Sequence, residues 1–245
     1  MNTYAQTDVG KTRDVNEDAV LATVVDDVAL LIVADGMGGH AAGDVASEMA
    51  VEQIEDEVLD GLNSGHADYE RLLGSAITAA NRRICDAAAA DTSLSGMGTT
   101  VVAALIDETS ALVATVGDSR CYHIDDELTQ VTTDQSLVQE LVEAGEITQA
   151  EAREHPQRNV VSQALGTTED VSPDFYRFTP TGVVLLCSDG LSEEVKPSAL
   201  QQLVTAHSSL SATADALINR ANENGGSDNI SVVLGRHVTD PPERE

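Results

Sequence analysis

Aromatic side chains are scarce in this chain, and their scarcity limits how a core can be built. Aromatic residues make up only 2 % of the 245 residues, and tryptophan is absent. Hydrophobic residues nevertheless make up 42 %, which argues against a disordered chain. A chain of this length can bury a sizeable core, and we expect that core to consist of Val, Leu, Ile and Ala.

Basic side chains are also few. Lysine and arginine number 13 against 42 aspartates and glutamates, which leaves a net charge of −29 at pH 7. Because such a surface repels phosphate backbones and anionic headgroups, we expect no nucleic-acid partner and no membrane partner. The composition resembles that of proteins from high-salt cytoplasms, where screening makes dense carboxylates tolerable. An ordinary acidic protein is the alternative.

Long apolar runs and closely spaced cysteines are missing too. No run approaches the roughly 18 apolar residues that a membrane span needs. The first residues lack the basic and apolar regions of a signal peptide, so we expect a cytoplasmic protein. Cys85, Cys121 and Cys187 are widely spaced and form no C-x-x-C motif. We therefore expect reduced, structural cysteines rather than a disulfide framework or a zinc site.

Periodicity predicts a mixed α and β architecture. Short apolar runs indicate strands at 19–25, 28–34, 101–106, 111–116, 183–187 and 230–234. Helical spacing of apolar residues indicates two long helices between the second and third strands, at about 50–58 and 69–87, and another at about 210–221. Strict β-α alternation is absent, which favours a largely antiparallel α+β layer fold in one domain. We expect the tail at 239–245 to be frayed.

The segment 136–165 has a different character. Apolar residues at 137–142 indicate a short helix that Gly145 ends. Thr148 and Glu151 then form a capping-box signature for a second short helix, which ends before Pro156. We expect a helical insertion beside the sheets.

Aspartates stand at the ends of the predicted strands. Asp18 directly precedes one strand and Asp35 directly follows the next, and in a hairpin these two positions share a rim. Asp118 and Asp189 follow two later strands, and Asp228 precedes the last. If these strands pair antiparallel, all five carboxylates converge on one edge.

That many carboxylates cannot share a desolvated rim without cations, because like charges would force them to take up protons. Hard oxygen ligands favour Mg²⁺, Mn²⁺ or Ca²⁺ over zinc. Glycines stand beside these aspartates, where a backbone carbonyl could join a metal shell. The simpler explanation is that loops are polar; it is strong for any single aspartate here and weaker for five. Arg13 could bind a phosphate bidentately or be an ordinary surface arginine.

Two other motifs suggest different enzymes. Residues 36–41 satisfy the dinucleotide fingerprint G-x-G-x-x-G/A after a strand and before a helix. However, Asp35 would lie beside the pyrophosphate, and a second parallel β-α unit is missing. Residues 186–190 mimic the nucleophile elbow of α/β-hydrolases but lack its first glycine.

Six motifs together resemble the PPM family, the metal-dependent protein phosphatases of the 2C class, in its bacterial-type single-domain form. They lie at 13–18, 35–40, 98–100, 117–120, 188–190 and 228–229. Each motif alone is weak, but all six occur in the family's order. Together they run from about residue 7 to about residue 235.

The resemblance implies an α+β fold, a four-layer α-β-β-α sandwich of two largely antiparallel sheets flanked by helices, over residues 1–238. It implies two core Mn²⁺ or Mg²⁺ ions at one end of the sheets, and a third ion. The metal ligands would be Asp18, Asp35, the carbonyl of Gly36, Asp189 and Asp228 for the core ions, and Asp118 with Asp189 for the third. Glu17 would orient a metal-bound water, Arg13 would bind the phosphate, and 136–165 would be the flap that shapes substrate access.

One position departs from the family pattern. Some eukaryotic members place a histidine, the proposed general acid, directly after the Asp-Gly pair, whereas here Met37 follows it and His40 comes three residues later. His40 is therefore one candidate for protonating the leaving alkoxide. A metal-bound water and His155 of the flap are the other candidates. A role of His40 in helix-start packing is the simpler reading.

The implied activity is hydrolysis of phosphoserine and phosphothreonine in proteins by a hydroxide that bridges two metal ions. A covalent phosphoenzyme is not needed, in line with the absence of a C-x₅-R motif. The implied partners are phosphorylated proteins, namely Ser/Thr kinases and their substrates, and we expect a monomer. The alternatives are a non-catalytic phosphoprotein-binding relative, or the same hydrolase acting on small phosphoesters.

Overall fold

Two antiparallel sheets form the centre of the molecule. The computed structural model describes residues 1–37, 42–65 and 68–237. One sheet has the order β2 (Asp18–Val25), β3 (Val28–Met37), β5 (Val101–Ile106), β6 (Ala111–Val116) and β9 (Asp174–Phe178), with β4 (Gly98–Thr99) paired to the end of β3. The other has the order β1 (Asn2–Asp8), β11 (Ile230–Arg236), β10 (Val183–Cys187), β7 (Arg120–Ile124) and β8 (Leu128–Gln130).

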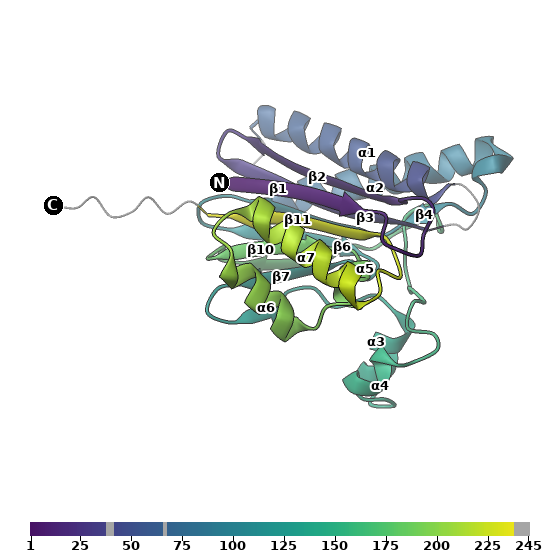
Figure 1. Cartoon of the computed structure of the whole chain (residues 1–245). Helices are drawn as coiled ribbons and strands as arrows, with labels where there is room; N and C mark the ends of the chain where they lie inside the picture. The colour runs from purple at the N-terminus through teal and green to yellow at the C-terminus, as the bar shows by residue number, and fades with distance from the viewer. Residues whose placement is uncertain (38–41, 66–67, 238–245) are drawn as a thin grey trace.

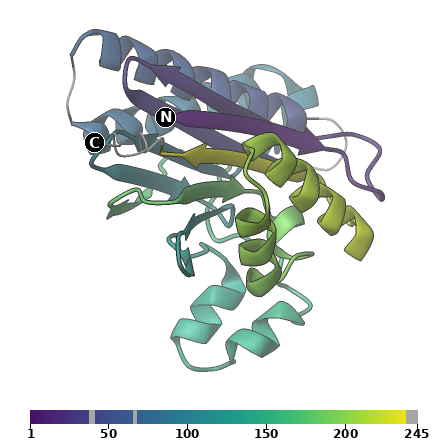
Figure 2. The same ribbon diagram turned by 60° about the vertical axis from the view of Figure 1, so that its left-hand side comes forward.

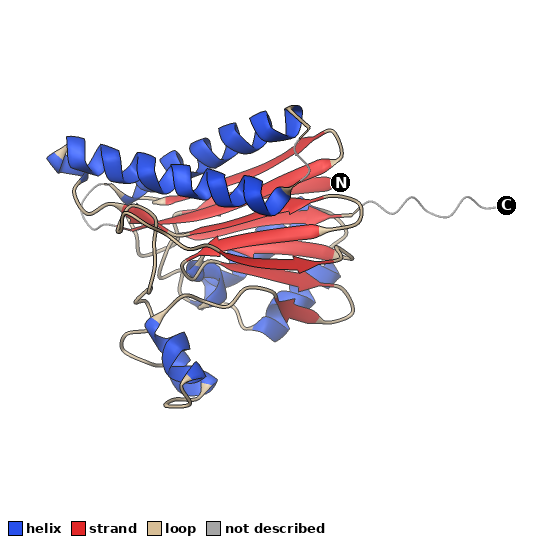
Figure 3. Ribbon diagram, turned by 180° about the vertical axis from the view of Figure 1, so that it is seen from behind, coloured by secondary structure: helices blue, strands red, loops and turns tan. Residues whose placement is uncertain are grey.

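Helices cover the outer face of each sheet. α1 (Gly43–Asn63) and α2 (Tyr69–Ala90) pack on the first sheet, and α6 (Pro197–Ala206) and α7 (Leu210–Asn224) on the second. Figures 1 and 3 show the strands between these two helix pairs. Among the shorter helices, η1 (Thr92–Leu94) follows α2, and α5 (Asp189–Ser192) follows β10. The antiparallel α+β layer fold that the sequence predicts is confirmed, and so is the four-layer α-β-β-α sandwich that the family resemblance implies.

The apolar strands are continuous because both of their faces are buried. In β3, Leu30 and Ile32 contact the helix layer, whereas Leu31 and Val33 face the other sheet. Because alternate side chains of a strand point to opposite faces, burial on both sides requires an unbroken apolar run. Burial of each such side chain contributes about 1.5–3 kcal/mol. Aliphatic residues dominate all three buried clusters, as the composition predicts.

The flap segment, residues 136–165, projects from one end of the sandwich (Figures 1 and 2). It contains α3 (Leu137–Glu143) and α4 (Gln149–Arg153), which match the two short helices that the sequence predicts. The expected capping box is present: the Thr148 side chain accepts from the Glu151 N–H, and the Glu151 carboxylate accepts from the Thr148 N–H. Two backbone hydrogen bonds hold its stem together, from Leu137 N–H to the Val160 carbonyl and from Ser162 N–H to the Gln135 carbonyl.

Several elements are not among the strands and helices expected from periodicity. Strands β1, β7, β8 and β9 carry polar or half-exposed residues that break up any apolar run. Helix α6 is also absent from the prediction, although its Leu200, Leu203 and Val204 have helical spacing and pack in the same buried cluster. None of the helices among the described residues is long and apolar enough to cross a membrane. The predicted frayed tail at 239–245 lies outside the described residues.

Candidate active site

The structure brings the five aspartates to one end of the sandwich. The register of β2 and β3 places Asp18 opposite Asp35, as the hairpin argument predicts. Asp189 and Asp228 flank strands of the second sheet: Asp189 begins α5 just after β10, and Asp228 lies just before β11. Burial raises the pKa of Asp35 most, and the charges of Asp18, Asp189, Asp118 and Asp228 raise it further, so the other four carboxyl groups lie within electrostatic reach of Asp35.

Asp18 joins the two sheets. Its Oδ2 accepts hydrogen bonds from Ser188 Oγ at 2.8 Å and from Ser231 Oγ at 2.6 Å, both from the second sheet. Its Oδ1 is buried and has no hydrogen-bond partner among the described residues. Burial raises the pKa of Asp18 to about 6, although the two serine hydroxyls lower it in part. A buried carboxylate oxygen without a donor is suited to a cation.

Burial also raises the pKa values of Asp118 and Asp189. Burial raises the pKa of Asp118 to about 7, with the charge of Asp134 adding to the shift. Burial followed by the charges of Asp118 and Asp228 raises the pKa of Asp189 well above its usual value. Such carboxyls either hold protons or sit beside cations at neutral pH. The residues present therefore fit divalent cations.

Side chains alone do not enclose an ion here. Within 1–37, 42–65 and 68–237, no group of three His, Cys, Asp or Glu residues is arranged so that it could hold one. Mg²⁺ and Mn²⁺ also take backbone carbonyls and water as ligands, so a site at this rim needs only one or two carboxylates per ion.

Gly36 is the backbone ligand that the family resemblance implies, and its surroundings require glycine. Its N–H donates to the Glu17 carbonyl at 3.1 Å, and it pairs with Thr99 of β4. A Cβ at Gly36 would lie 2.2 Å from the Gly43 carbonyl oxygen and 2.4 Å from that of Glu17. Only glycine allows this close approach of three backbone segments beside Asp35.

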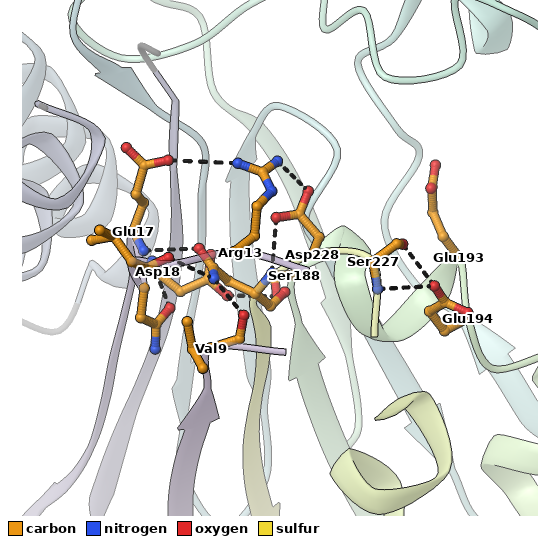
Figure 4. A network of polar contacts seen from close by, with 12 residues as sticks. Val9, Arg13, Glu17, Asp18, Ser188, Glu193, Glu194, Ser227 and Asp228 are labelled. Atoms are coloured by element: carbon orange, nitrogen blue, oxygen red, sulfur yellow. Dashed lines mark hydrogen bonds and ion pairs between the residues drawn. The ribbon is translucent and has the colours of Figure 1, made fainter. Parts of the chain in front are cut away.

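Arg13 lies at the outer edge of the rim (Figure 4). Its Nη2 donates to Asp228 Oδ2 at 2.8 Å, and its Nη1 lies 3.8 Å from Glu17 Oε2. The Arg13 side chain remains 46 % exposed, so part of its guanidinium group is accessible to an anion. Arg13 and Glu17 therefore both lie beside Asp228 at this rim.

Asn229 fixes the loop that carries Arg13. Its Nδ2 donates to the carbonyls of Val9 and Val15, at 2.9 and 3.0 Å. Its Oδ1 accepts from the Glu17 N–H at 2.8 Å. The buried amide thus places the residues on either side of Arg13 next to Asp228.

A cavity of about 360 Å³ lies between the rim and the flap segment. Asp118 and Asp189 line it on one side, and Arg153 and Arg158 of the flap segment line it on the other. Arg158 Nε lies 3.3 Å from Glu193 Oε2, which gives an ion pair between the flap segment and the residue after α5. A larger and more open hollow of about 710 Å³ lies over α2, and none of the five aspartates lines it.

Two histidines, His40 and His155, are candidates for the general acid. His40 lies outside the described residues. His155 lies in the turn after α4, where its Nδ1 accepts from the Gln157 N–H at 3.2 Å. Among the described residues, those that line the 360 Å³ cavity include Arg158 but not His155.

Sequence reasoning missed the polar groups that support the aspartates. Ser231 interrupts the apolar run of β11 and is fully buried, and Ser188 is fully buried after β10. Thr100 Oγ1 accepts from the Asp35 N–H at 3.1 Å and lies 2.7 Å from Ser119 Oγ. The available signal was a small hydroxyl residue inside or directly beside an apolar strand, because a buried hydroxyl needs a partner.

Comparison with known proteins gives a consistent result. The family model described as protein phosphatase 2C matches residues 8–235. The serine/threonine phosphatase stp of Listeria welshimeri is 41 % identical over 239 residues, which cover 96 % of this chain and 95 % of that protein.

Solved structures of serine/threonine phosphatases also have the same fold as this chain. Serine/threonine phosphatase Stp1 from Staphylococcus aureus superposes with a TM-score of 0.88 at 34 % identity, over 97 % of this chain and 95 % of that one. The catalytic domain of the serine threonine protein phosphatase PstP, solved in complex with 2 manganese ions, superposes with a TM-score of 0.82 at 36 % identity, over 95 % and 96 %. The chain therefore belongs to the protein phosphatase 2C family of metal-dependent phosphatases.

Proposed function

We propose that this chain hydrolyses phosphoserine and phosphothreonine in proteins, with two Mn²⁺ or Mg²⁺ ions held at the aspartate rim. The observation that carries the proposal is the buried Oδ1 of Asp18, which has no hydrogen-bond partner among the described residues, in a rim where burial and neighbouring charges raise the pKa values of Asp18, Asp35 and Asp189. The names of the relatives, which are serine/threonine phosphatases, support this substrate class.

Specific residues would hold the ions. Asp18, Asp35, the Gly36 carbonyl, Asp189 and Asp228 would hold the two core ions, and Asp118 with Asp189 would hold a third. Bound divalent cations supply a lowered pKa for an attacking water and neutralise charge on the phosphoryl group. The close packing of Gly36 and the two hydroxyls on Asp18 support this assignment, because both fix ligand positions before an ion arrives.

Arg13 and Glu17 would bind the phosphoryl group and orient the attacking water. Arg13 would bind two phosphoryl oxygens through its guanidinium group, whose planar fork matches them. Asp228 and Glu17 hold that group at the edge of the rim. Glu17 would also orient a water at the metals. The assignment of His40 as general acid stays a prediction.

The non-catalytic alternative has less support. Relatives that only bind phosphoproteins usually lose metal aspartates, whereas here all five predicted aspartates are present and lie together. Hydrolysis of small phosphoesters would use the same site. Only the ratio of kcat/KM for a phosphothreonine peptide to kcat/KM for a small phosphoester distinguishes this alternative from a protein phosphatase. We further propose that the chain acts as a cytoplasmic monomer on Ser/Thr kinases and their substrates; light scattering after gel filtration tests the monomer.

The decisive assay measures phosphate release from a phosphothreonine peptide with Mn²⁺ and with EDTA, at low salt and in molar KCl. We expect release that requires the metal and that falls at least about a thousandfold in Asp189→Ala. Asp56→Ala, a matched change at an exposed aspartate on α1, should keep full activity. Folded, Mn²⁺-loaded protein that releases no phosphate but binds the peptide would favour the non-catalytic alternative instead.

A further inference from the structure

Gln135 lies where the flap segment leaves the sandwich, and it contacts the turn that carries Asp118. The Gln135 N–H donates to the Gly117 carbonyl at 2.9 Å. The side-chain Oε1 of Gln135 accepts from the Gly117 N–H, also at 2.9 Å. One residue thus satisfies both backbone groups of Gly117, which directly precedes Asp118.

The same glutamine also holds the other arm of the flap stem. Its carbonyl accepts from the Ser162 N–H at 2.8 Å, and its Oε1 also accepts from Gln163 Nε2 at 3.1 Å. Its Nε2 donates to Asp174 Oδ2 at 2.7 Å, at the start of β9. Gln135 therefore connects three parts of the chain: the turn at Gly117, both arms of the stem, and the first sheet.

Gly117 depends on this arrangement because it has little freedom to move. It is buried and has a φ of +105°, and a Cβ there would lie 2.7 Å from two Thr100 side-chain atoms. A buried N–H that loses its partner keeps the full cost of desolvation. The turn would have to shift to reach water, and Asp118 would shift with it.

On the other side of Asp118, Ser119 makes contacts that do not involve Gln135. Ser119 Oγ contacts Thr100 Oγ1, which also accepts from the Asp35 N–H. That link ties Asp118 to the core of the rim, whereas the Gln135 link ties it to the flap segment. Asp118 therefore lies between the two systems.

We propose that Gln135 is a positioning residue that couples the flap segment to the metal ligand Asp118, so that ordering of either favours ordering of the other. The coupling is reciprocal: an ion at Asp118 should steady the flap segment, and a loosened stem should weaken that ion's binding. The inference rests on the proposed function only in taking Asp118 as a metal ligand.

The test replaces the Gln135 side chain and measures both the order of the flap segment and Mn²⁺ binding. In Gln135→Ala, we expect hydrogen exchange of the Gly117 amide to become about tenfold faster or more. Trypsin should cut faster after Arg153 and Arg158 of the flap segment. Mn²⁺ binding, titrated by electron paramagnetic resonance, should weaken by about tenfold at one site only, the site that Asp118→Asn removes. Gln202→Ala, an exposed glutamine on α6, is the matched control and should change none of these.

A milder variant covers the case in which Gln135→Ala does not fold. Asp174→Ala removes the acceptor for Gln135 Nε2 at an exposed position, and it should change all three readouts in the same direction by a smaller factor. Faster flap cleavage with unchanged Mn²⁺ binding would overturn the coupling, and so would weaker binding with an unchanged flap. None of the readouts requires turnover, so an inactive wild-type protein with coupled readouts would count against the proposed function alone.

Discussion

Asp18 shows how a single residue can favour function at the expense of stability. Its carboxyl is buried and accepts hydrogen bonds from two serine hydroxyls on one oxygen, whereas the other oxygen has no donor within the part of the chain that the structure describes. Replacement by asparagine removes a buried charge while keeping the shape. We expect Asp18→Asn to stabilise the metal-free protein by about 1–3 kcal/mol at pH 7.5, since each unit of pKa shift is worth about 1.4 kcal/mol.

Urea unfolding in a chelator measures this change, with the exposed Asp56→Asn as the control. The same variant should lose most of the stabilisation that Mn²⁺ gives the wild type. A metal-free Asp18→Asn that is less stable than the wild type would contradict this account of the carboxyl.

The raised pKa values also predict how the metal-free protein responds to pH. The pKa values of Asp18 and Asp118 in the folded state are about 6 and about 7, above their ordinary value of 3.8. The folded state therefore binds more protons between about pH 4 and about pH 7, and its stability falls as the pH rises through that range. Unfolding in chelator and molar KCl, which screens surface repulsion, should show this fall, and Asp18→Asn should show a shallower one. Stability that rises from pH 5 to pH 7 would be inconsistent with the raised values.

The residue scale also shows what sequence could and could not reveal. The aspartates were predictable because each stands just before or just after an apolar run, next to a turn. Ser188 and Ser231 were not, because a serine in or beside an apolar strand looks the same whether it packs or donates a hydrogen bond. Gln135 was missed because its partners, Gly117, Gln163 and Asp174, are distant in sequence.

At the scale of elements, three backbone segments meet at Gly36: the end of β3, the loop before β2, and the start of α1. A methyl group there would collide with two carbonyl oxygens that belong to backbone and cannot rotate away. We expect Gly36→Ala to destabilise the protein by about 1–3 kcal/mol and to weaken Mn²⁺ binding, because the Gly36 carbonyl must move.

Thermal unfolding and Mn²⁺ titration measure the two effects. Gly65→Ala is the control for Mn²⁺ binding: its φ of +76° should cost stability through backbone strain, but an added Cβ meets no described atom within 4 Å, so Mn²⁺ binding should stay at the wild-type level. Gly36→Ala that binds Mn²⁺ like the wild type would exclude its carbonyl as a ligand.

Which elements were predictable depended on burial. Strands with both faces buried, such as β5 and β6, were predicted at their observed bounds because nothing polar interrupts them. Strand β1 contains Asn2, Thr3, Gln6 and Thr7 and pairs on one side only, with β11, so composition gave little indication of it. Helix α6 has a proline at its start and Leu200, Leu203 and Val204 at helical spacing, so its ten residues did carry a helical signal that the prediction did not use.

At the scale of the whole molecule, the net charge of −29 sets the response to salt. Like charges on a compact surface repel one another, and the repulsion is screened within about 3 Å at 1 M salt. We expect the free energy of unfolding to rise between 0.1 M and 2 M KCl and refolding to recover in molar KCl. Unfolding in urea, which adds no ions, measures the free energy of unfolding at each KCl concentration. Indifference to KCl would favour an ordinary acidic protein over a salt-adapted one.

The central claim is that aspartates from both sheets hold two ions that hydrolysis requires. Its most direct test is Mn²⁺ occupancy measured at equilibrium in the same samples in which phosphate release from a phosphothreonine peptide is recorded. We predict negligible release until two ions are bound per chain, with neither full occupancy nor release in Asp18→Asn. Full release in chelator, or undiminished release from Asp18→Asn, would contradict the account.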